Sequence, residues 1–332
     1  MVYQTEAELD VRNLLVFRSI HCETGRVTQQ KTMFQAVDAA NDDSFTGPDW
    51  GLFVSVSLIW GASFLLIAEA LEGLTPGTVT LGRVGVGAIT LFVIRAIRGG
   101  GKSIEREDYG SVFLLSLLWV AVPFTLFPLA QEHINSAVTG LLNGATPVFA
   151  GLVSALLVKV APRGVQLAGI AAGFFGIILI SLGSSGGGST ELRGVLMVLA
   201  ATACYGFAVN LASPLQAKYG PINIMTVMLG LATLWVLPFG LFTIGENEWS
   251  VGPIAAVLFL GAVGTGLAYW IMAALVGRVG GIRASFITYL IPVVSLTLGV
   301  LIRDDTVRAL AIVGAIITIG GAAMASRAKA TS

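Results

Sequence analysis

The chain has 332 residues, of which 55% are hydrophobic and only 11% are charged, and its net charge is zero. A soluble domain carries about 25% charged residues, so this chain has too little charge to cover a soluble core of its size. The neutral balance gives no sign of nucleic-acid binding. Two cysteines and two histidines are too few for a disulfide framework or a usual zinc centre, and we expect no metal and no cofactor.

Residues 1–48 differ from the rest because they are polar, and Asp42, Asp43 and Ser44 are typical of a solvated linker. We expect a disordered cytoplasmic tail here. A further hypothesis is that the native protein starts at Met33, because nothing before it looks necessary for the membrane part. N-terminal sequencing of the native protein would test this.

Ten apolar segments follow Asp49, and each is long enough to cross a hydrocarbon core of about 30 Å. They comprise residues 52–70, 78–97, 110–131, 136–158, 165–184, 193–216, 222–244, 252–276, 284–302 and 307–326. The connections are short and leave no room for a second soluble domain. The sequence therefore predicts an all-α, multi-pass integral membrane protein with ten transmembrane helices.

Lysine and arginine are concentrated in alternate loops. With the tail in the cytoplasm, the inside loops hold basic groups such as Arg95, Arg98 and Lys102. The outside loops hold only three basic residues, Arg193, Arg303 and Arg308, and the outside turns carry glutamates instead: Glu69, Glu72, Glu132, Glu246 and Glu248. This bias predicts that both termini are cytoplasmic.

The two halves of the chain resemble each other at a shift of 145 residues. Trp60, Pro76 and Pro147 then fall on Tyr205, Pro221 and Pro292. We interpret residues 50–184 and 192–326 as two repeats of five helices each. Because five is odd, the second repeat enters the membrane from the opposite side, and inverted repeats of this kind place a site at the bilayer midplane.

Polar side chains and a proline share the fourth helix and the ninth. Pro147 and Pro292 lie near the helix centres, where proline kinks a helix, and we interpret both as hinges beside a cavity rather than as kinks used only for packing. The polar residues before them lie at helical spacing: Ser136, Thr139, Asn143 and Thr146, then Ser285, Thr288, Tyr289 and Ser295. The alternative is interhelical hydrogen bonding, which is weakest as an explanation for Asn143.

Aromatic residues are predicted at similar depth in several helices. Trp60, Ser63 and Phe64 belong to the first helix, and Trp119, Tyr205 and Tyr269 to the third, sixth and eighth. Trp and Tyr usually form belts at the membrane surface, but Trp60, Trp119 and Tyr269 lie too deep for that. We interpret these six residues, with the amide of Asn210, as candidate walls of a binding cavity.

Arg83 is the one full charge well inside a predicted helix, roughly 8 Å from its outer end. It could anchor an anionic substrate group such as a carboxylate, or it could be a structural arginine that snorkels outward to Glu69, Glu72 or carbonyls, which we favour. No acid is predicted at mid-membrane, which argues against proton antiport through a buried carboxylate. Glu132 and His133, at the end of the third helix, remain candidates for coupling.

Two glycine patterns have plain interpretations. Gly99-Gly100-Gly101-Lys102-Ser103 resembles the end of a P-loop, but a membrane helix rather than a strand precedes it, so we interpret it as a basic cytoplasmic turn. Gly169 and Gly173 have the spacing of a close helix–helix contact, either within the bundle or between protomers.

The order of several motifs resembles EamA-type proteins of the drug/metabolite transporter superfamily. In the first half these are Trp60-Gly61-Ala62-Ser63-Phe64, Leu74-Thr75-Pro76 and then Arg83; in the second they are Gly264–Tyr269, Arg283-Ala284-Ser285 and Tyr289–Val293. The resemblance covers about residues 50–326. It implies two inverted five-helix repeats, a central cavity walled mainly by helices 1, 3, 4, 6, 8 and 9, and movement of amino acids or other small metabolites.

The resemblance favours a secondary transporter, not an enzyme, that exports small metabolites by alternating access from the inner (plasma) membrane of a bacterium. The alternatives are an uncoupled facilitator of the same solutes, a non-transporting receptor and an intramembrane enzyme. The four-helix multidrug relatives carry a glutamate midway along their first helix, and this chain has none between Ile59 and Phe64. The expected partners are a small-molecule substrate and the lipid bilayer. The substrate, and whether the protein is a monomer or a homodimer, stay open.

Overall fold

The computed structural model describes residues 45–158, 164–184 and 189–327. The described residues form helices and no strand. The predicted polar tail and the proposed start at Met33 lie outside them. Among the described residues, nine helical segments are long and apolar enough to cross a membrane, and Ala309–Ala325 is a shorter apolar helix in the tenth position.

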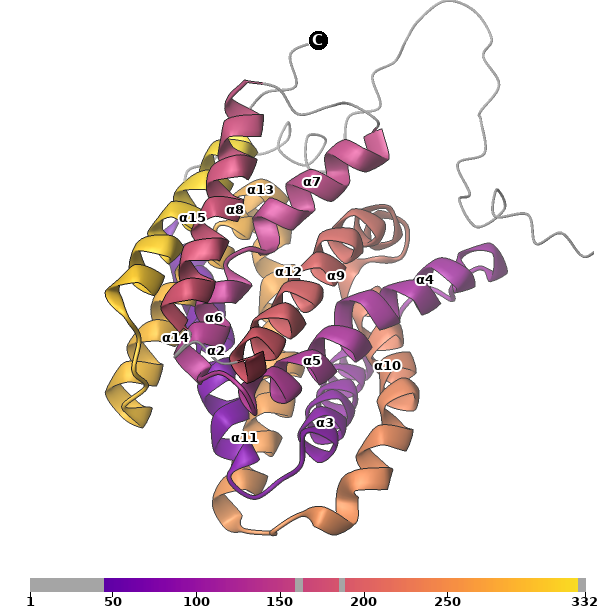
Figure 1. Ribbon diagram of the computed structural model, residues 1–332. Coiled ribbons are helices and arrows are strands. Elements are labelled where there is room, and N and C mark those ends of the chain that lie inside the picture. The colour runs from indigo at the N-terminus through magenta and orange to yellow at the C-terminus, as the bar shows by residue number, and fades with distance from the viewer. Residues whose placement is uncertain (1–44, 159–163, 185–188, 328–332) are drawn as a thin grey trace, which may run out of the picture. The chain divides into compact units, whose positions relative to one another are not determined.

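The first half contains the first five membrane segments in chain order (Figure 1). The first two are α2 (Gly47–Leu71) and α3 (Pro76–Ile97). The third is composite, with η2 (Arg106–Asp108), α4 (Tyr109–Ser116), the π-helical segment η3 (Leu117–Ala121) and α5 (Val122–Gln131). The fourth is divided into α6 (Ser136–Asn143) and α7 (Thr146–Val158), and the fifth is α8 (Val165–Ser184).

The second half repeats this plan. It begins with α9 (Ser189–Tyr219) and α10 (Pro221–Thr243), which the short η4 (Ile244–Glu246) extends. The eighth segment comprises α11 (Val251–Gly261), the π-helical η5 (Ala262–Leu267) and α12 (Ala268–Val279). The ninth is divided into α13 (Gly281–Ser285) and α14 (Ile287–Arg303), and α15 (Ala309–Arg327) is the tenth.

Local sequence explains where the helices begin. The side chain of Thr75 accepts a hydrogen bond from the backbone N–H of Thr78 at 3.3 Å, and Pro76 follows as the first residue of α3. Asn135 caps α6 in the same way, accepting from Val138 N at 2.9 Å. Such caps satisfy the free N–H groups of a first helical turn, and proline tolerates that position because its missing N–H would be unpaired there anyway.

The helices pack across the two halves rather than within them. The first helix, α2, lies against α11, α12 and α14, and its counterpart α9 lies against α5 and α7. Further extensive contacts join segments that correspond at the 145-residue shift: α3 with α10, the fourth segment with the ninth through α6 and α14, and α8 with α15 (Figure 1). Helix α3 also lies against α11 and η5 of the second half. Each half therefore completes its packing with the other half, as intertwined repeats require.

The two π-helical segments also correspond. Segment η3 begins at Leu117 and η5 begins at Ala262, 145 residues later. Each interrupts the third membrane segment of its half and widens the helix by one residue per turn. Such π-bulges are frequent at functional sites, and these two contribute Trp119 and Thr265 to the centre of the bundle.

The glycine pair Gly169 and Gly173 makes its close contact within the bundle. A Cβ atom on Gly169 would lie 2.6 Å from Gly321 O, and a Cβ on Gly321 would lie 2.5 Å from Gly173 N. Glycine is needed here because the backbones of α8 and α15 touch. This decides between the two alternatives that the sequence left open for this pair.

Candidate functional site

Arg83 points into the bundle. Its side chain is buried, with 6% exposure. Its Nε donates a hydrogen bond to Thr265 Oγ1 at 3.2 Å, and its guanidinium carbon lies 3.7 Å from the centroid of the Phe124 ring. Tyr205 and Tyr269 are the titratable side chains near enough to act on it electrostatically. Helices from both halves therefore surround this cation.

No carboxylate pairs with Arg83 among the residues that the structure describes. The expectation that it snorkels towards Glu69 or Glu72 is wrong. Both carboxylates are taken by Arg303 at the end of α14, at 2.6 Å each. Arg83 thus remains a buried cation held by one hydroxyl and one aromatic face, and an uncompensated charge of this kind is costly.

Aromatic side chains gather around Arg83 in a group that we term the aromatic centre. Trp60 packs edge-on against Tyr269, with ring centroids 6.0 Å apart, and Trp119 lies beside the Tyr269 hydroxyl. The other members are linked in series: Phe64 to Phe127 at 5.4 Å, and Phe127 to Tyr205 at 6.1 Å. The structure thus brings together Trp60, Phe64, Trp119, Tyr205 and Tyr269, whose role in binding stays a prediction. Phe124 and Phe127, which complete the group, were not predicted.

The fourth membrane segment is broken beside this centre. Helix α6 ends at Asn143 and α7 begins at Thr146, so that Pro147 is the second residue of a new helix. The hydroxyl of Thr146 donates to the backbone oxygen of Asn143 at 2.8 Å. The side-chain oxygen of Asn143 is buried and has no partner. An unsatisfied amide oxygen at a helix break is a candidate ligand group.

Pro292 does not break its helix in the same way. It lies inside α14, and the ninth segment is divided at Phe286 instead. The Pro292 ring packs against the break in the fourth segment, because a Cβ on Gly144 would lie 2.9 Å from Pro292 Cγ. Pro292 therefore contacts the break that precedes Pro147, although only Pro147 lies in the first turn of a helix. A hinge role for either proline stays a prediction.

Several predicted residues satisfy their hydrogen bonds locally. Ser63 donates to Ile59 O at 3.0 Å, and Thr288 donates to Ser285 O at 2.7 Å. The amide of Asn210 donates to Gly206 O at 2.8 Å. Tyr289 packs against a separate small cluster that contains Val148 and lies apart from the aromatic centre. Ser63, Thr288 and Asn210 thus bond to backbone oxygens three or four residues earlier, and a role of all four residues in substrate binding stays a prediction.

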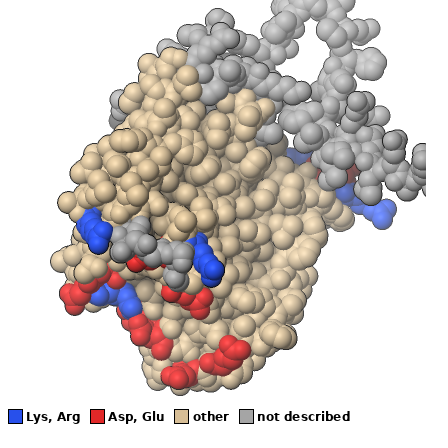
Figure 2. Space-filling model, in the orientation of Figure 1, with Lys and Arg blue, Asp and Glu red and all other residues tan. Residues whose placement is uncertain are grey.

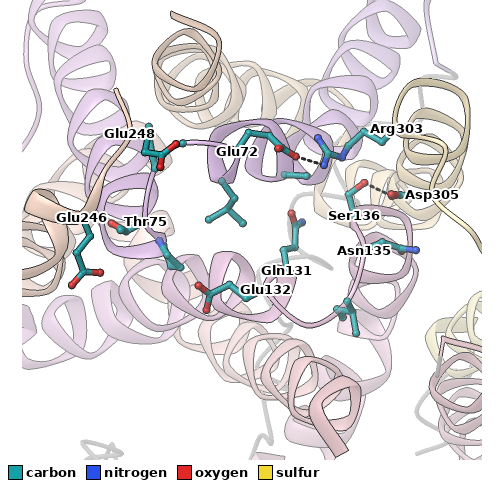
Figure 3. A pocket seen from close by; sticks show the side chains of 16 residues that line it. Glu72, Thr75, Gln131, Glu132, Asn135, Ser136, Glu246, Glu248, Arg303 and Asp305 are labelled. Atoms are coloured by element: carbon teal, nitrogen blue, oxygen red, sulfur yellow. Dashed lines mark hydrogen bonds and ion pairs between the residues drawn. The ribbon is translucent and has the colours of Figure 1, made fainter. Parts of the chain in front are cut away.

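The larger of two described cavities lies at the end of the bundle that holds residues 72–75 and 244–250, which we term the outer end. It has a volume of about 590 Å³. Its charged lining is mainly acidic, as Figure 3 shows: Glu72, Glu132, Glu246, Glu248 and Asp305, with Arg303 as the basic member. Figure 2 shows acidic side chains gathered at the lower end of one face, with a few basic side chains among and just above them and a broad uncharged surface farther up. Glu132 lines this cavity; His133 does not line it and instead packs against Gly194.

Gln131 connects the outer cavity to the aromatic centre. It lines the cavity, and its Nε2 donates to the backbone oxygen of Phe64 at 3.1 Å (Figure 3). Its Oε1 is buried and unpartnered. Gln131 was not among the residues predicted from the sequence. Arg303 and Asp305 were also overlooked as lining residues, although Asp305 accepts from Ser136 Oγ at 2.6 Å and so fixes the start of α6.

Comparison with known proteins decides the family. Residues 50–182 and 192–327 match the EamA-like transporter family. The chain belongs to this family. The resemblance to EamA-type proteins and the ten-helix fold of two repeats are thereby confirmed. This EamA family member is a multi-pass integral membrane protein and a transporter rather than an enzyme.

Several bacterial proteins with transporter names are similar in sequence to this chain. The "Uncharacterized transporter YoaV" of Bacillus subtilis is 26% identical over 81% of this chain and 93% of its own length. The "Probable terminal-alkyne amino-acid exporter" of Streptantibioticus cattleyicolor is 24% identical over 84% of this chain and 93% of its own. The "Probable amino-acid metabolite efflux pump" of Escherichia coli is 23% identical over 82% and 93%. A solved crystal structure with 20% identity matches 84% of this chain and 97% of its own, with a TM-score of 0.60, which supports the fold.

Proposed function

We propose that this transporter exports small metabolites that carry a carboxylate, such as amino acids, and that Arg83 binds the carboxylate in the aromatic centre. The observation that supports this is the buried Arg83 guanidinium, which has no acidic partner among the described residues. A guanidinium donates two parallel hydrogen bonds to the oxygens of a carboxylate. A substrate carboxylate would therefore supply the counter-charge that the protein itself lacks.

The rest of the site suits the other parts of an amino acid. The rings of Trp60, Tyr205 and Tyr269 offer apolar surface and cation–π contacts to an ammonium group. The unpartnered oxygens of Asn143 and Gln131 are acceptors for the same ammonium. The names of the exporter of Streptantibioticus and the efflux pump of Escherichia coli favour amino acids and outward movement.

We propose alternating access, with both termini in the cytoplasm and the protein in the plasma membrane of a bacterium. The basic inner loops and acidic outer turns support this orientation. The intertwined repeats supply two structurally related halves that can move against each other around a fixed site. The break between α6 and α7 supplies a point at which the fourth segment can bend.

The mode of coupling separates an exporter from an uncoupled facilitator. The aromatic centre contains no aspartate or glutamate among its described members. Coupling by protons would then involve Glu132 or His133 near the outer end. Uptake of labelled amino acids into proteoliposomes, with and without an imposed pH gradient, distinguishes the two. Gradient-driven flux that Glu132→Gln abolishes indicates coupling, and flux that ignores the gradient indicates a facilitator.

Trp60→Ala is expected to slow amino-acid transport by at least about tenfold, because one aromatic wall contributes roughly 1.4 kcal/mol of contact. Initial uptake rates into proteoliposomes measure this. Trp249→Ala is the matched control, because Trp249 is an exposed tryptophan of the outer turn and lies outside the aromatic centre. Equal losses in the two variants would argue against the proposed site. Normal flux of decarboxylated amines by the native protein would argue against carboxylate recognition.

Asn143→Leu is expected to lower transport without lowering stability. Among the described residues the buried Asn143 oxygen has no partner to lose, and leucine, which has the same branched shape, removes an unsatisfied polar group that costs about 1–3 kcal/mol. The melting temperature of the purified protein should therefore stay level or rise while uptake falls. A lower melting temperature would show that the amide is structural. Thr202→Val, at a buried threonine that bonds its own helix at 2.9 Å, serves as the control for polar removal elsewhere.

A further inference from the structure

We propose that a second cavity, at the inner end of the bundle, binds an anionic phosphate group carried by a phospholipid headgroup or by a soluble phosphate. Helix α3 runs from the outer cavity, which Pro76 lines, to this inner cavity, which Arg95 and Arg98 line. The inner cavity has a volume of about 370 Å³. The turn between α9 and α10 and the residues after Tyr269 on α12 form its other walls.

The cavity carries uncompensated positive charge. Neither Arg95 nor Arg98 makes an ion pair among the described residues. Two acids beside the lining residue Tyr219 are already engaged: Lys218 pairs with Glu105 at 2.6 Å and with Asp108 at 2.8 Å. The hydroxyl of Tyr219, another lining residue, donates to Asp108 Oδ2 at 2.5 Å. Two arginines are thus left with free donors, and their planar guanidinium groups match phosphate oxygens.

Polar atoms in the wall of the cavity are unsatisfied. Asn223 is 5% exposed, and its Nδ2 donates to Lys102 O at 2.6 Å, but its Oδ1 has no partner. Arg95 Nε is also buried without a partner. Both atoms border Gly101, where an added Cβ would lie 2.6 Å from Asn223 Oδ1 and 2.9 Å from Arg95 Nε. A side chain at position 101 would displace the Asn223 amide and the Arg95 guanidinium, so Gly101 lets these two side chains lie close together in the wall. Among the described residues, the half-buried Arg95 Nε has no acceptor there.

The turn after α3 takes a conformation that glycine favours. Gly99 and Gly100 have φ angles of +90° and +82°, and Gly100 N donates back to Arg95 O at 2.9 Å. This reversal keeps the end of α3, with Arg95 and Arg98, against the cavity. The basic turn that the sequence predicted at Gly99–Ser103 thereby acquires a specific role.

The surroundings favour a lipid as the source of the phosphate. Arg98 lies over the Trp270 ring at 4.9 Å, and tryptophan is typical of the membrane–water interface. Ile97, directly before Arg98, is 80% exposed, and α3 has further exposed apolar residues at Ile89, Phe92 and Val93. Acyl chains can lie along such a surface while a headgroup enters the cavity. Basic pockets between membrane helices are known places for anionic headgroups.

The test is thermal unfolding of the full chain in uncharged detergent, titrated with phosphatidylglycerol, phosphatidylcholine or inorganic phosphate. Phosphatidylglycerol is expected to raise the melting temperature of the native protein. The double variant Arg95→Gln/Arg98→Gln should need at least about tenfold more lipid for the same rise, since hydrogen bonds to charged groups are lost. The control Lys102→Gln/Arg106→Gln removes the same charge from exposed positions and should respond as the native protein does. Arg98→Lys keeps the charge but loses the planar group. The amount of lipid that this variant needs should lie between those of the native protein and the Arg95→Gln/Arg98→Gln variant.

The outcomes separate the two sources. A response to phosphatidylglycerol alone assigns a lipid headgroup, and a response to inorganic phosphate as well assigns a soluble phosphate ligand. No response to either ligand overturns the proposal. An equal response to phosphatidylcholine, or equal losses in the two double variants, also overturns it. The ligand-free melting temperature of the arginine variants should match the native value because neither side chain has an ion pair to lose.

Discussion

Arg83→Met is expected to abolish transport of carboxylate substrates while leaving the protein at least as stable as before. Each hydrogen bond between charged groups contributes about 1.5–3 kcal/mol, so that loss of a two-bond contact should lower kcat/KM by roughly 10²- to 10⁴-fold. Stability should not fall, because Arg83 has no acidic partner and replacing a buried charge with an apolar side chain is often neutral or stabilising. Uptake into proteoliposomes and the melting temperature in detergent give the two readouts.

Three further variants make the Arg83 prediction specific. Arg83→Lys keeps the charge but loses the planar pair of donors, so partial activity is expected. Arg193→Met removes one arginine from an exposed position at the outer end and should leave transport unchanged. Thr265→Val removes the hydroxyl that holds Arg83 Nε and should weaken transport less than Arg83→Met does. Should Arg83→Met unfold the protein, the arginine would be a structural cation and the proposed site would lose its anchor.

The position of Arg83 shows what the sequence could predict and what it could not. Hydropathy places the residue within an apolar helix, and the structure shows its side chain buried there. Whether the Arg83 side chain turns towards Glu69 and Glu72 depends on which other basic residues pair with these acids. Arg303 takes Glu69 and Glu72, although the sequence placed Arg303 only as an outer-loop charge. A partner supplied by a helix more than 200 residues away is not visible in a local pattern.

Only some members of the aromatic centre could be predicted, because the others are brought to it by contacts between distant helices. Trp60, Trp119 and Tyr269 stand out because aromatic residues with polar atoms are unusual at that depth. Phe124 and Phe127 do not stand out, because phenylalanine is an ordinary apolar residue in a membrane helix. Their contribution follows from ring contacts with Arg83, Phe64 and Tyr205, and only the fold brings these together.

Helix-face arguments held only where the helix is continuous. Steps of three, four and seven residues keep side chains on one face of an uninterrupted α-helix. The fourth segment is broken after Asn143 and the ninth at Phe286, so residues on the two sides of each break lose their common phase. Tyr289, beyond the second break, packs against the small cluster that contains Val148. The π-helical segments η3 and η5 have the same effect and carry no clear signature in the sequence.

Gly321→Val is expected to destabilise the protein by about 3 kcal/mol, the upper end for an overpacked core. A Cβ on Gly321 would lie 2.5 Å from Gly173 N and 2.6 Å from Gly169 O, which are backbone atoms that move only if α8 itself moves. The pair α8 and α15 forms the most extensive helix contact in the described chain, so its separation affects the fold as a whole. The melting temperature and the yield of monodisperse protein in detergent measure the effect.

Gly320→Val is the matched control, because it makes the same substitution one residue earlier in the same helix. No atom lies within 4 Å of a Cβ on Gly320, so the valine should be accommodated without a change in melting temperature. The two variants share helix propensity and added apolar volume, and they differ only in what the new side chain meets. Similar destabilisation by both would assign the effect to valine in α15 rather than to the backbone contact. A loss confined to Gly321→Val would show that contact between the last helices of the two repeats holds the bundle together, at a place distinct from the aromatic centre.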